Sequence, residues 1–262
     1  MENHPIGIFD SGVGGTSIWK EINALLPHEH TVYLADSKNA PYGEKSKEEI
    51  VALSIKNTEF LLQEGCKLIV VACNTATTNA IDYLRARYKV PFIGIEPAIK
   101  PAALQSESKK VGILATKGTL SSMLFHSTSE NHANGIEIIE QVGTGLVPLI
   151  ESGKVDSPET RALLEKYVNP MIAAGIDYLV LGCTHYPYLL PVLKTLLPAH
   201  VKIIDSGEAV ARQTKAVLVR HDLLTTSKEN GTHRFITNAN VKILENFLKE
   251  YKDSLELHYQ DF

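Results

Sequence analysis

One stretch of the sequence occurs twice, as Glu64-Gly65-Cys66-Lys67-Leu68-Ile69-Val70-Val71-Ala72-Cys73 and again, 110 positions later, as Ala174-Gly175-Ile176-Asp177-Tyr178-Leu179-Val180-Leu181-Gly182-Cys183. Each copy has a glycine that can stop a helix, an apolar run as long as a buried strand, and then a cysteine. Two more segments repeat at nearly the same spacing, 7–11 with 112–116 and 90–95 with 201–206. This near-constant spacing predicts a duplicated structural unit.

Short apolar runs alternate with helical patterns along most of the chain. The runs lie at 6–9, 32–35, 68–72, 92–95, 111–115, 136–139, 178–181 and 201–204. Such alternation predicts βαβ units and mostly parallel sheets. The clearest helix begins at Ser46, which can form a capping box with Glu49, and ends at Gly65.

We therefore expect an α/β fold of two similar domains with mostly parallel sheets and an active site in the cleft between them. The first domain is expected to comprise residues 1–97 plus 209–262, and the second residues 98–208. Residues after about 209 have no counterpart in the repeat. We expect that tail to pack back onto the first domain.

The composition is that of an ordinary globular protein, with 44% hydrophobic and 21% charged residues. The net charge of −4 leaves no basic surplus for a phosphate backbone, so we expect no nucleic-acid partner. The amino terminus does not resemble a secretory signal, and the apolar runs are too short to cross a bilayer. Three cysteines are few, and their number is odd, so we expect no disulfide framework. We expect a cytoplasmic protein without membrane contact.

Polar side chains and cysteines follow several of the expected strands. They are Asp10, Ser11, Cys73, Thr116 and Cys183. Ligands of open parallel sheets bind beyond the carboxyl ends of the strands. In a duplicated fold the two sets can face each other, so that a cysteine approaches a shared cleft from each side.

A single cysteine at a strand end is usually a small buried residue, but two at equivalent places favour a function. A disulfide between them has no evident use in a reducing compartment, and no C-x-x-C or H-x-x-x-H spacing indicates a metal site. Proton transfer at two faces of one carbon remains, and a thiol pKa near 8.5 suits it. Cys66 begins its strand and is interpreted as packing.

Neighbouring residues can support such proton transfer. Asp10 either orients or deprotonates Cys73, or it caps the helix that follows. His185 lies two residues after Cys183, so in an extended segment both side chains point the same way. The glycines at 12, 14 and 15 either present backbone N–H groups to a substrate carboxylate or simply make a tight turn.

Six motifs, in this order along the whole chain, resemble those of the glutamate racemases, cofactor-independent enzymes of the aspartate/glutamate racemase superfamily. They are Phe9-Asp10-Ser11-Gly12-Val13-Gly14-Gly15, Ala35-Asp36 with Pro41-Tyr42-Gly43, Ala72-Cys73-Asn74-Thr75, Gly94-Ile95-Glu96-Pro97, Gly182-Cys183-Thr184-His185-Tyr186-Pro187 and Ile204-Asp205-Ser206-Gly207. The family has two similar α/β domains with the active site between them, as the repeat also predicts.

The resemblance implies that Cys73 and Cys183 are the acid/base thiols, one for each enantiomer of glutamate. It implies that Asp10 assists Cys73, that His185 assists Cys183, and that Glu151 supports His185. The substrate contacts it implies are Asp10, Ser11, Tyr42, Gly43, Asn74, Thr75, Thr116, Thr119, Thr184 and His185. It further implies no cofactor, no metal, a homodimer, and D-glutamate as a product used for bacterial peptidoglycan.

Other readings remain open. A dinucleotide-binding oxidoreductase would use Gly12-x-Gly14-x-x-Ser17 and Asp36, although Ser17 replaces the third glycine and both strand-end cysteines stay unexplained. A Cys/His hydrolase would use Cys183 and His185 without needing Cys73. A two-lobed intracellular sensor is a further alternative. Aspartate racemase of the same superfamily also remains possible, because packing around the substrate side chain is not visible in the sequence.

Overall fold

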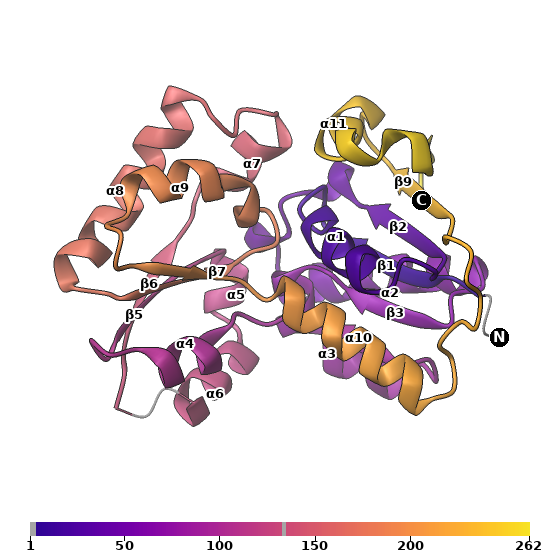
Figure 1. Cartoon of the computed structure of the whole chain (residues 1–262), viewed down its shortest axis with the longest axis horizontal. Coiled ribbons are helices and arrows are strands. Elements are labelled where there is room, and N and C mark those ends of the chain that lie inside the picture. The colour runs from indigo at the N-terminus through magenta and orange to yellow at the C-terminus, as the bar shows by residue number, and fades with distance from the viewer. Residues whose placement is uncertain (1–3, 133–134) are drawn as a thin grey trace.

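Two parallel sheets organise the protein, and each forms the centre of one lobe (Figure 1). The structure is a computed structural model that describes residues 4–132 and 135–262. The first sheet has the order β10-β9-β2-β1-β3-β4, with β1 (Ile6–Asp10), β2 (Thr31–Ala35), β3 (Leu68–Val71), β4 (Phe92–Gly94), β9 (His233–Thr237) and β10 (Leu255–Tyr259). The second has the order β6-β5-β7-β8, with β5 (Lys110–Ala115), β6 (Glu137–Val142), β7 (Tyr178–Gly182) and β8 (Lys202–Ile204).

The order β2-β1-β3-β4 in the first sheet recurs as β6-β5-β7-β8 in the second. The repeated stretches end in β3 and β7, which are the corresponding strands of the two sheets. Strand pairing within the described residues is parallel throughout. The predicted α/β fold of two similar units with mostly parallel sheets is therefore confirmed.

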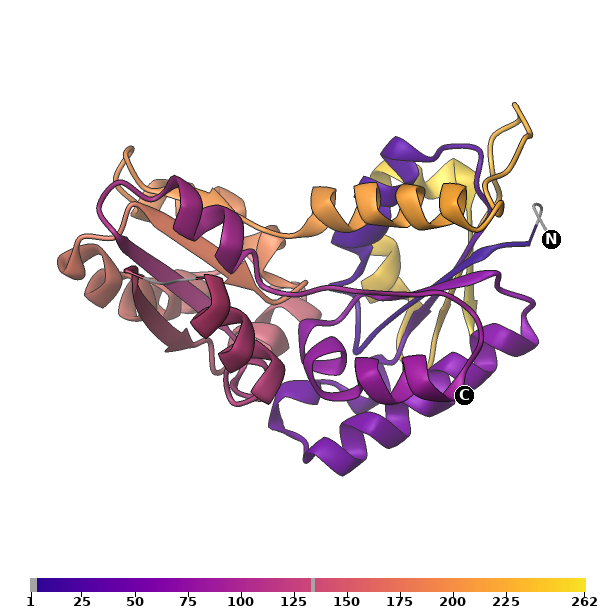
Figure 2. The same ribbon diagram turned by 90° about the horizontal axis from the view of Figure 1, so that it is seen from below.

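Helices cover both faces of each sheet. They are α1 (Thr16–Leu25), α2 (Lys47–Gln63), α3 (Asn74–Arg87), α4 (Ile99–Gln105), α5 (Lys117–Leu120), α6 (Met123–His132), α7 (Leu146–Glu151), α8 (Pro158–Ala174), α9 (Leu190–Leu196), α10 (Gly207–Arg220) and α11 (Val241–Phe247), with short 3-10 turns η1 (Ser37–Asn39), η2 (Tyr42–Glu44), η3 (Tyr186–Leu189) and η4 (Lys249–Ser254). Figure 2 shows α10 on one side of the first sheet and α2 and α3 on the other. Along the described chain, no helix has the length and apolarity needed to span a membrane.

Alternation of side chains along the strands explains these layers. In β1, Ile6 and Ile8 point into the core that contains Trp19 of α1, whereas Phe9 points into the opposite core with Leu61 of α2. Helix α2 has the expected start, because the Ser46 hydroxyl accepts from the Glu49 amide at 3.3 Å while the Glu49 carboxylate accepts from the Ser46 amide at 2.9 Å.

The tail packs on the first lobe, as predicted. Helix α10 lies against α1, and β9 pairs with β2 from Thr31 opposite His233 to Ala35 opposite Thr237. The list of apolar runs missed β9 and β10. In β9 (His233–Thr237) apolar and polar residues do not alternate, whereas Leu255 and Leu257 of β10 do alternate with polar residues but form no continuous apolar run. We propose the domain division 1–97 plus 209–262 and 98–208 on the basis of sheet membership; residues 1–3 and 133–134 of those ranges lie outside the described residues.

The carboxylate of Glu29, which forms a buried ion pair within the first lobe, also holds the tail. Lys67 Nζ lies 2.6 Å from Glu29 Oε2, and the two side chains are only 1% and 2% exposed. The other carboxylate oxygen of Glu29 accepts from the backbone amide of Thr225 at 2.8 Å. One carboxylate therefore joins the turn before β2, the start of β3 and the segment that follows α10.

We expect Glu29→Gln to lower the free energy of unfolding by about 3 kcal/mol, because it removes the negative charge that compensates the buried Lys67 ammonium. Urea denaturation followed by circular dichroism measures this change. The control Glu208→Gln breaks an exposed ion pair with Arg212 and should cost less than about 1 kcal/mol. Equal losses in the two variants would contradict the role of the buried pair.

Candidate active site

The two strand-end cysteines line the same small cavity between the lobes. Cys73 follows β3 and Cys183 follows β7, so the parallel sheets present them from opposite sides. The cavity is lined by Ser11, Pro41, Tyr42, Gly43, Cys73, Asn74, Thr75, Thr116, Val147, Cys183, Thr184 and His185. Its volume is about 10 Å³, which is room for about one water molecule. The cleft is closed in this structure.

Cys73 is held as a neutral thiol. It caps the amino end of α3, where its Sγ accepts from the Ala76 amide at 3.4 Å and lies 3.7 Å from the Ser11 hydroxyl. Burial, reinforced by the nearby Asp10 carboxylate, raises the pKa of Cys73 well above its ordinary value. The raised pKa favours the protonated form of this thiol, which can therefore donate a proton.

Cys183 belongs to a hydrogen-bonded chain with His185 and Glu151. Its Sγ lies 3.8 Å from His185 Nδ1, and His185 Nε2 lies 2.6 Å from Glu151 Oε1. Burial disfavours the imidazolium, but the contacts with Cys183 and Glu151 outweigh burial and raise the pKa of His185 well above its usual range. The imidazole is placed to accept a proton from Cys183 or to return it.

Asp10 is buried at the end of β1, and the geometry is compatible with both of its expected roles, as a partner of Cys73 and as a cap of the following helix. Its Oδ2 accepts from the Gly15 amide at 2.8 Å, as a cap of the turn before α1 would, and its Oδ1 accepts from the Thr184 hydroxyl at 3.3 Å. Burial raises the pKa of Asp10 to about 6. It influences Cys73 through its charge.

The glycine loop after β1 forms a platform for the other lobe. A Cβ at Gly12 would overlap the Glu151 carboxylate, and a Cβ at Gly14 would overlap the His185 ring. The amides of Val13 and Gly15 donate to Glu151 and Asp10, both at 2.8 Å. These two amides are therefore not open to a substrate carboxylate. The side chains of the other lobe also occupy the place where a dinucleotide would need its pyrophosphate, which argues against the oxidoreductase reading.

Asp36 is fully buried and supports the loop that carries Tyr42. It accepts from the Tyr42 hydroxyl at 2.5 Å, from Asn238 Nδ2 at 2.6 Å and from Asn39 Nδ2 at 2.8 Å. It is not open to a ribose, which also argues against dinucleotide binding. The Tyr42 hydroxyl is already bonded, so Tyr42 can face a substrate with its ring or backbone rather than with a free hydroxyl.

Three threonine hydroxyls meet across the cleft. Thr75 Oγ1 lies 2.7 Å from that of Thr116 and 3.3 Å from that of Thr119, and the latter two are 3.0 Å apart. Thr119 lies behind the cavity wall rather than in it. Within the part of the chain that the structure describes, the buried amide oxygen and nitrogen of Asn74 have no hydrogen-bond partner, so both are available to a ligand.

Sequence reasoning missed two lining residues, Pro41 and Val147. Pro41 belongs to the motif Pro41-Tyr42-Gly43 but was not predicted to contact a substrate, whereas nothing in the pattern around Val147 indicates a site. Cys66 is remote from this chemistry, and burial raises its pKa to about 12. Among the residues described, no three His, Cys, Asp or Glu side chains gather where they could hold a metal ion.

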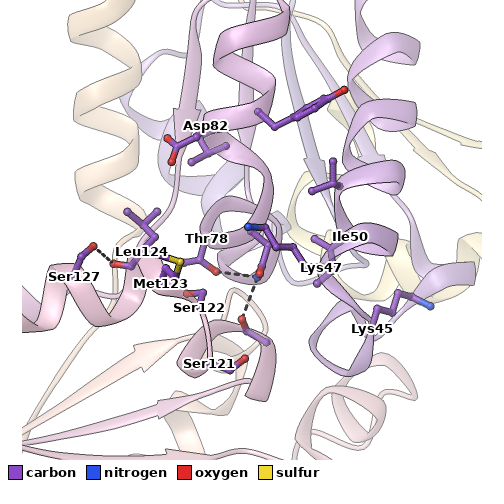
Figure 3. A pocket seen from close by; sticks show the side chains of 15 residues that line it. Lys45, Lys47, Ile50, Thr78, Asp82, Ser121, Ser122, Met123, Leu124 and Ser127 are labelled. Carbon is purple, nitrogen blue, oxygen red and sulfur yellow. Dashed lines mark hydrogen bonds between the residues drawn. The ribbon is translucent and has the colours of Figure 1, made fainter.

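A much larger hollow of about 740 Å³ lies between α2, α3 and the start of α6 (Figure 3). Its wall includes Lys45, Thr78, Asp82, Ser122 and Met123. None of the residues that line it is a cysteine or a histidine. Size therefore does not identify the active site, whereas the convergence of titratable groups does.

Comparisons with known proteins identify the family of this chain. The Asp/Glu/Hydantoin racemase family matches residues 6–214. A glutamate racemase from Herpetosiphon aurantiacus is 46% identical over 91% of this chain and 94% of its own length. The crystal structure of Escherichia coli glutamate racemase in complex with L-glutamate and the activator UDP-MurNAc-Ala has a TM-score of 0.85 and 34% identity, covering 97% of each chain. The Francisella tularensis glutamate racemase in complex with D-glutamate has a TM-score of 0.84 and 30% identity, covering 98% of each chain.

The raised pKa of Asp10 predicts a pH-dependent stability. Between the ordinary pKa of 3.8 and the folded pKa of about 6, the unfolded chain has lost this proton while the folded chain keeps it. The stabilisation is therefore complete below the ordinary value and is lost as pH rises through about 6. The folded and unfolded pKa of Asp10 differ by about 2, which corresponds to a free energy of about 3 kcal/mol. Relative to Asp10→Asn, the wild type should lose about that much unfolding free energy between about pH 4 and pH 7, measured by urea denaturation.

Asp177 provides a control of opposite sign. Slight burial works against ionisation there, but hydrogen bonds from Ser106, Ser108 and Glu107 outweigh it and lower the pKa of Asp177 to about 2. Its stabilisation is present above the ordinary pKa and is lost as pH falls through about 2. Asp177→Asn should thus reduce stability more at neutral than at acidic pH. The same trend with pH in both variants would contradict the assignment for Asp10.

Proposed function

The chain belongs to the Asp/Glu/hydantoin racemase family, and we infer that it interconverts L-glutamate and D-glutamate. Relatives of nearly the same length are glutamate racemases, and solved structures of similar fold bind each enantiomer of glutamate. The observation in this molecule that carries the inference is the pair of thiols in one closed cavity, each supplied by one of the two repeated units.

We propose a two-thiol mechanism. One cysteine, as thiolate, removes the α-proton from one face of the amino acid and becomes a thiol. The electron pair stays on the α-carbon, and the other cysteine delivers a proton to the opposite face and becomes a thiolate. Atoms and charge balance without an added reagent, and the configuration is inverted. The reverse reaction exchanges the roles of Cys73 and Cys183.

The surroundings support different tasks at the two thiols. Cys73 is a protonated thiol near Ser11 and Asp10, as a proton donor requires. Cys183 has a histidine neighbour that is itself bound to a carboxylate, so its proton can move to and from the imidazole. We propose Asp10 as the electrostatic partner of Cys73, His185 as the proton partner of Cys183, and Glu151 as the support of His185.

Polar groups around the thiols suit the charged groups of an amino acid. We propose that Ser11, Asn74, Thr75, Thr116 and Thr184 bind the carboxylates and ammonium of glutamate, with Asn74 contributing an unused donor and acceptor. We propose that two further predicted residues, Gly43 and Thr119, shape the site through packing and hydrogen bonding and do not bind the substrate directly. Gly43 lets its loop approach Thr116, and Thr119 orients the Thr75 and Thr116 hydroxyls.

Glutamate needs far more room than the closed cavity provides. Since the cavity holds about one water, the lobes must separate at the seam between η2 and the second lobe before a substrate can enter. Reclosure would exclude water and place the α-carbon between the thiols. Desolvation then strengthens every electrostatic contact inside the site.

The proposed biological role is supply of D-glutamate for peptidoglycan, and hence cell-wall formation and cell shape, as in the family the sequence resembles. We also propose a cytoplasmic location and a homodimer. The acidic net charge supports the expectation that nucleic acid is not a partner. The Cys/His hydrolase alternative leaves the Cys73 thiol without a task, and glutamate is favoured over aspartate by the relatives that the chain matches.

Isotope exchange tests the reaction directly. Incubated with either enantiomer of glutamate in D₂O without added cofactor, the protein should incorporate deuterium at the α-carbon and abolish the optical rotation. Proton NMR and polarimetry measure the two effects, and a parallel incubation with aspartate measures specificity. A folded sample that produces neither effect with glutamate would refute the activity, and faster exchange of aspartate would favour the aspartate racemase alternative.

Replacement of the thiols tests the mechanism. Cys73→Ser and Cys183→Ser should each lower kcat by about 10²- to 10⁴-fold, because a hydroxyl is a much weaker acid than a thiol. The control Cys66→Ala removes a buried thiol at the far end of β3 and should keep nearly full activity. Substantial activity in either serine variant would exclude the two-thiol mechanism.

A further inference from the structure

A tyrosine outside the cavity is linked to the glycine loop of the other lobe. The hydroxyl of Tyr188 in η3 makes a short hydrogen bond with Thr16 Oγ1 at the start of α1. The Thr16 hydroxyl donates its single proton to the carbonyl of Val13 at 2.6 Å. Tyr188 must therefore be the donor to Thr16, and the direction of this chain of hydrogen bonds is fixed.

The same loop residue contacts the histidine side of the active site. The Val13 amide donates to Glu151 Oε1 at 2.8 Å, and that oxygen lies 2.6 Å from His185 Nε2. The Tyr188 amide also donates to the carbonyl of His185 at 3.2 Å. Hydrogen bonds thus connect Tyr188 to His185 by two routes. One passes through Thr16, Val13 and Glu151, and the other is the backbone hydrogen bond between Tyr188 and His185.

The ring of Tyr188 is held independently of its hydroxyl. It packs edge-on against Phe247 of α11 with ring centroids 4.5 Å apart, and Lys20 Nζ lies 5.4 Å from its centroid. Burial raises the pKa of Tyr188, so the phenol remains protonated and able to donate. Removing the hydroxyl alone would leave the ring in place and break only the connection to Thr16.

We propose that Tyr188 is a positioning residue for the Cys183 side of the racemase: through Thr16 and Val13 its hydroxyl fixes Glu151, and thereby the imidazole of His185 beside Cys183. Tyr188 does not line the cavity and touches no reacting atom. This role rests on the proposed function. It assigns to the seam between the lobes the task of assembling one of the two proton-transfer groups whenever the cleft closes.

The symmetry of the reaction dictates how such a role must be measured. Two enantiomers have equal free energy, so any variant lowers kcat/KM by the same factor in both directions. The α-deuterium isotope effect separates the two thiols. If proton transfer at Cys183 alone becomes slower, the isotope effect rises for the enantiomer whose proton Cys183 removes. It falls for the other enantiomer, because breaking its C–D bond at Cys73 then limits the rate less.

We expect Tyr188→Phe to lower kcat/KM about three- to tenfold, the effect of about one hydrogen bond. The isotope effects on kcat/KM for the two α-deuterated enantiomers should move in opposite directions. The control Tyr178→Phe removes a hydroxyl that lies 3.3 Å from Gln105 Oε1, at the opposite end of the strand leading to Cys183. Each of the two tyrosine variants should lower the Tm by a few degrees, but Tyr178→Phe should leave both isotope effects unchanged.

A double variant tests the path through Thr16. Thr16→Val breaks the same link, so Tyr188→Phe combined with Thr16→Val should lose no more kcat/KM than Thr16→Val alone. Additive losses, or isotope effects that keep the wild-type values in Tyr188→Phe, would overturn the positioning role. Absence of glutamate racemisation by the wild type would instead refute the proposed function, so the two failures are distinct.

Discussion

The carboxylate of Glu151 is the contact on which the active site depends. It accepts a hydrogen bond from the Val13 amide of the first lobe and lies 2.6 Å from His185 of its own lobe. Gly12 and Gly14 make this possible, because any side chain there would occupy the space of the carboxylate or the imidazole. Because Glu151 is bound by residues of both lobes, its hydrogen bond with Val13 can form only while the cleft is closed.

Burial gives that geometry its chemical consequence. Asp10 and His185 lie close together out of water, and their surroundings shift the balance between the charged and neutral forms of each. The imidazolium is retained because Glu151 and Cys183 offset its desolvation, whereas Asp10 and Cys73 have raised pKa values. The same desolvation that would destabilise an isolated charge thus favours the protonated forms of Asp10 and Cys73, the groups that we propose act on one side of the substrate.

The sequence predicts the framework of the fold and the centre of the site, but not the contacts across the seam. A strand followed by a cysteine is a local pattern, so Cys73 and Cys183 could be predicted from the repeat, and the capping box of α2 could be read from Ser46 and Glu49. Glu151 has no local signal, and only a resemblance indicated it. The pairing of Thr16 with Tyr188 joins residues 172 positions apart and depends on how the lobes close. Strands β9 and β10 were not predicted because neither contains a continuous apolar run; β9 is placed by pairing with the edge of β2, and β10 by pairing with β9.

The two repeated units place a cysteine at equivalent positions but give the two cysteines unequal surroundings. Two residues after its cysteine, the first unit has Thr75 and the second has His185. Cys73 caps a helix and faces a hydroxyl, whereas Cys183 faces an imidazole bound to a carboxylate. A symmetric pair of thiols would compete for the same protonation state, since like groups close together cannot both ionise easily. In the mechanism we propose, these unequal partners allow one thiol to act as the acid while the other acts as the base, as inversion of a carbon centre requires.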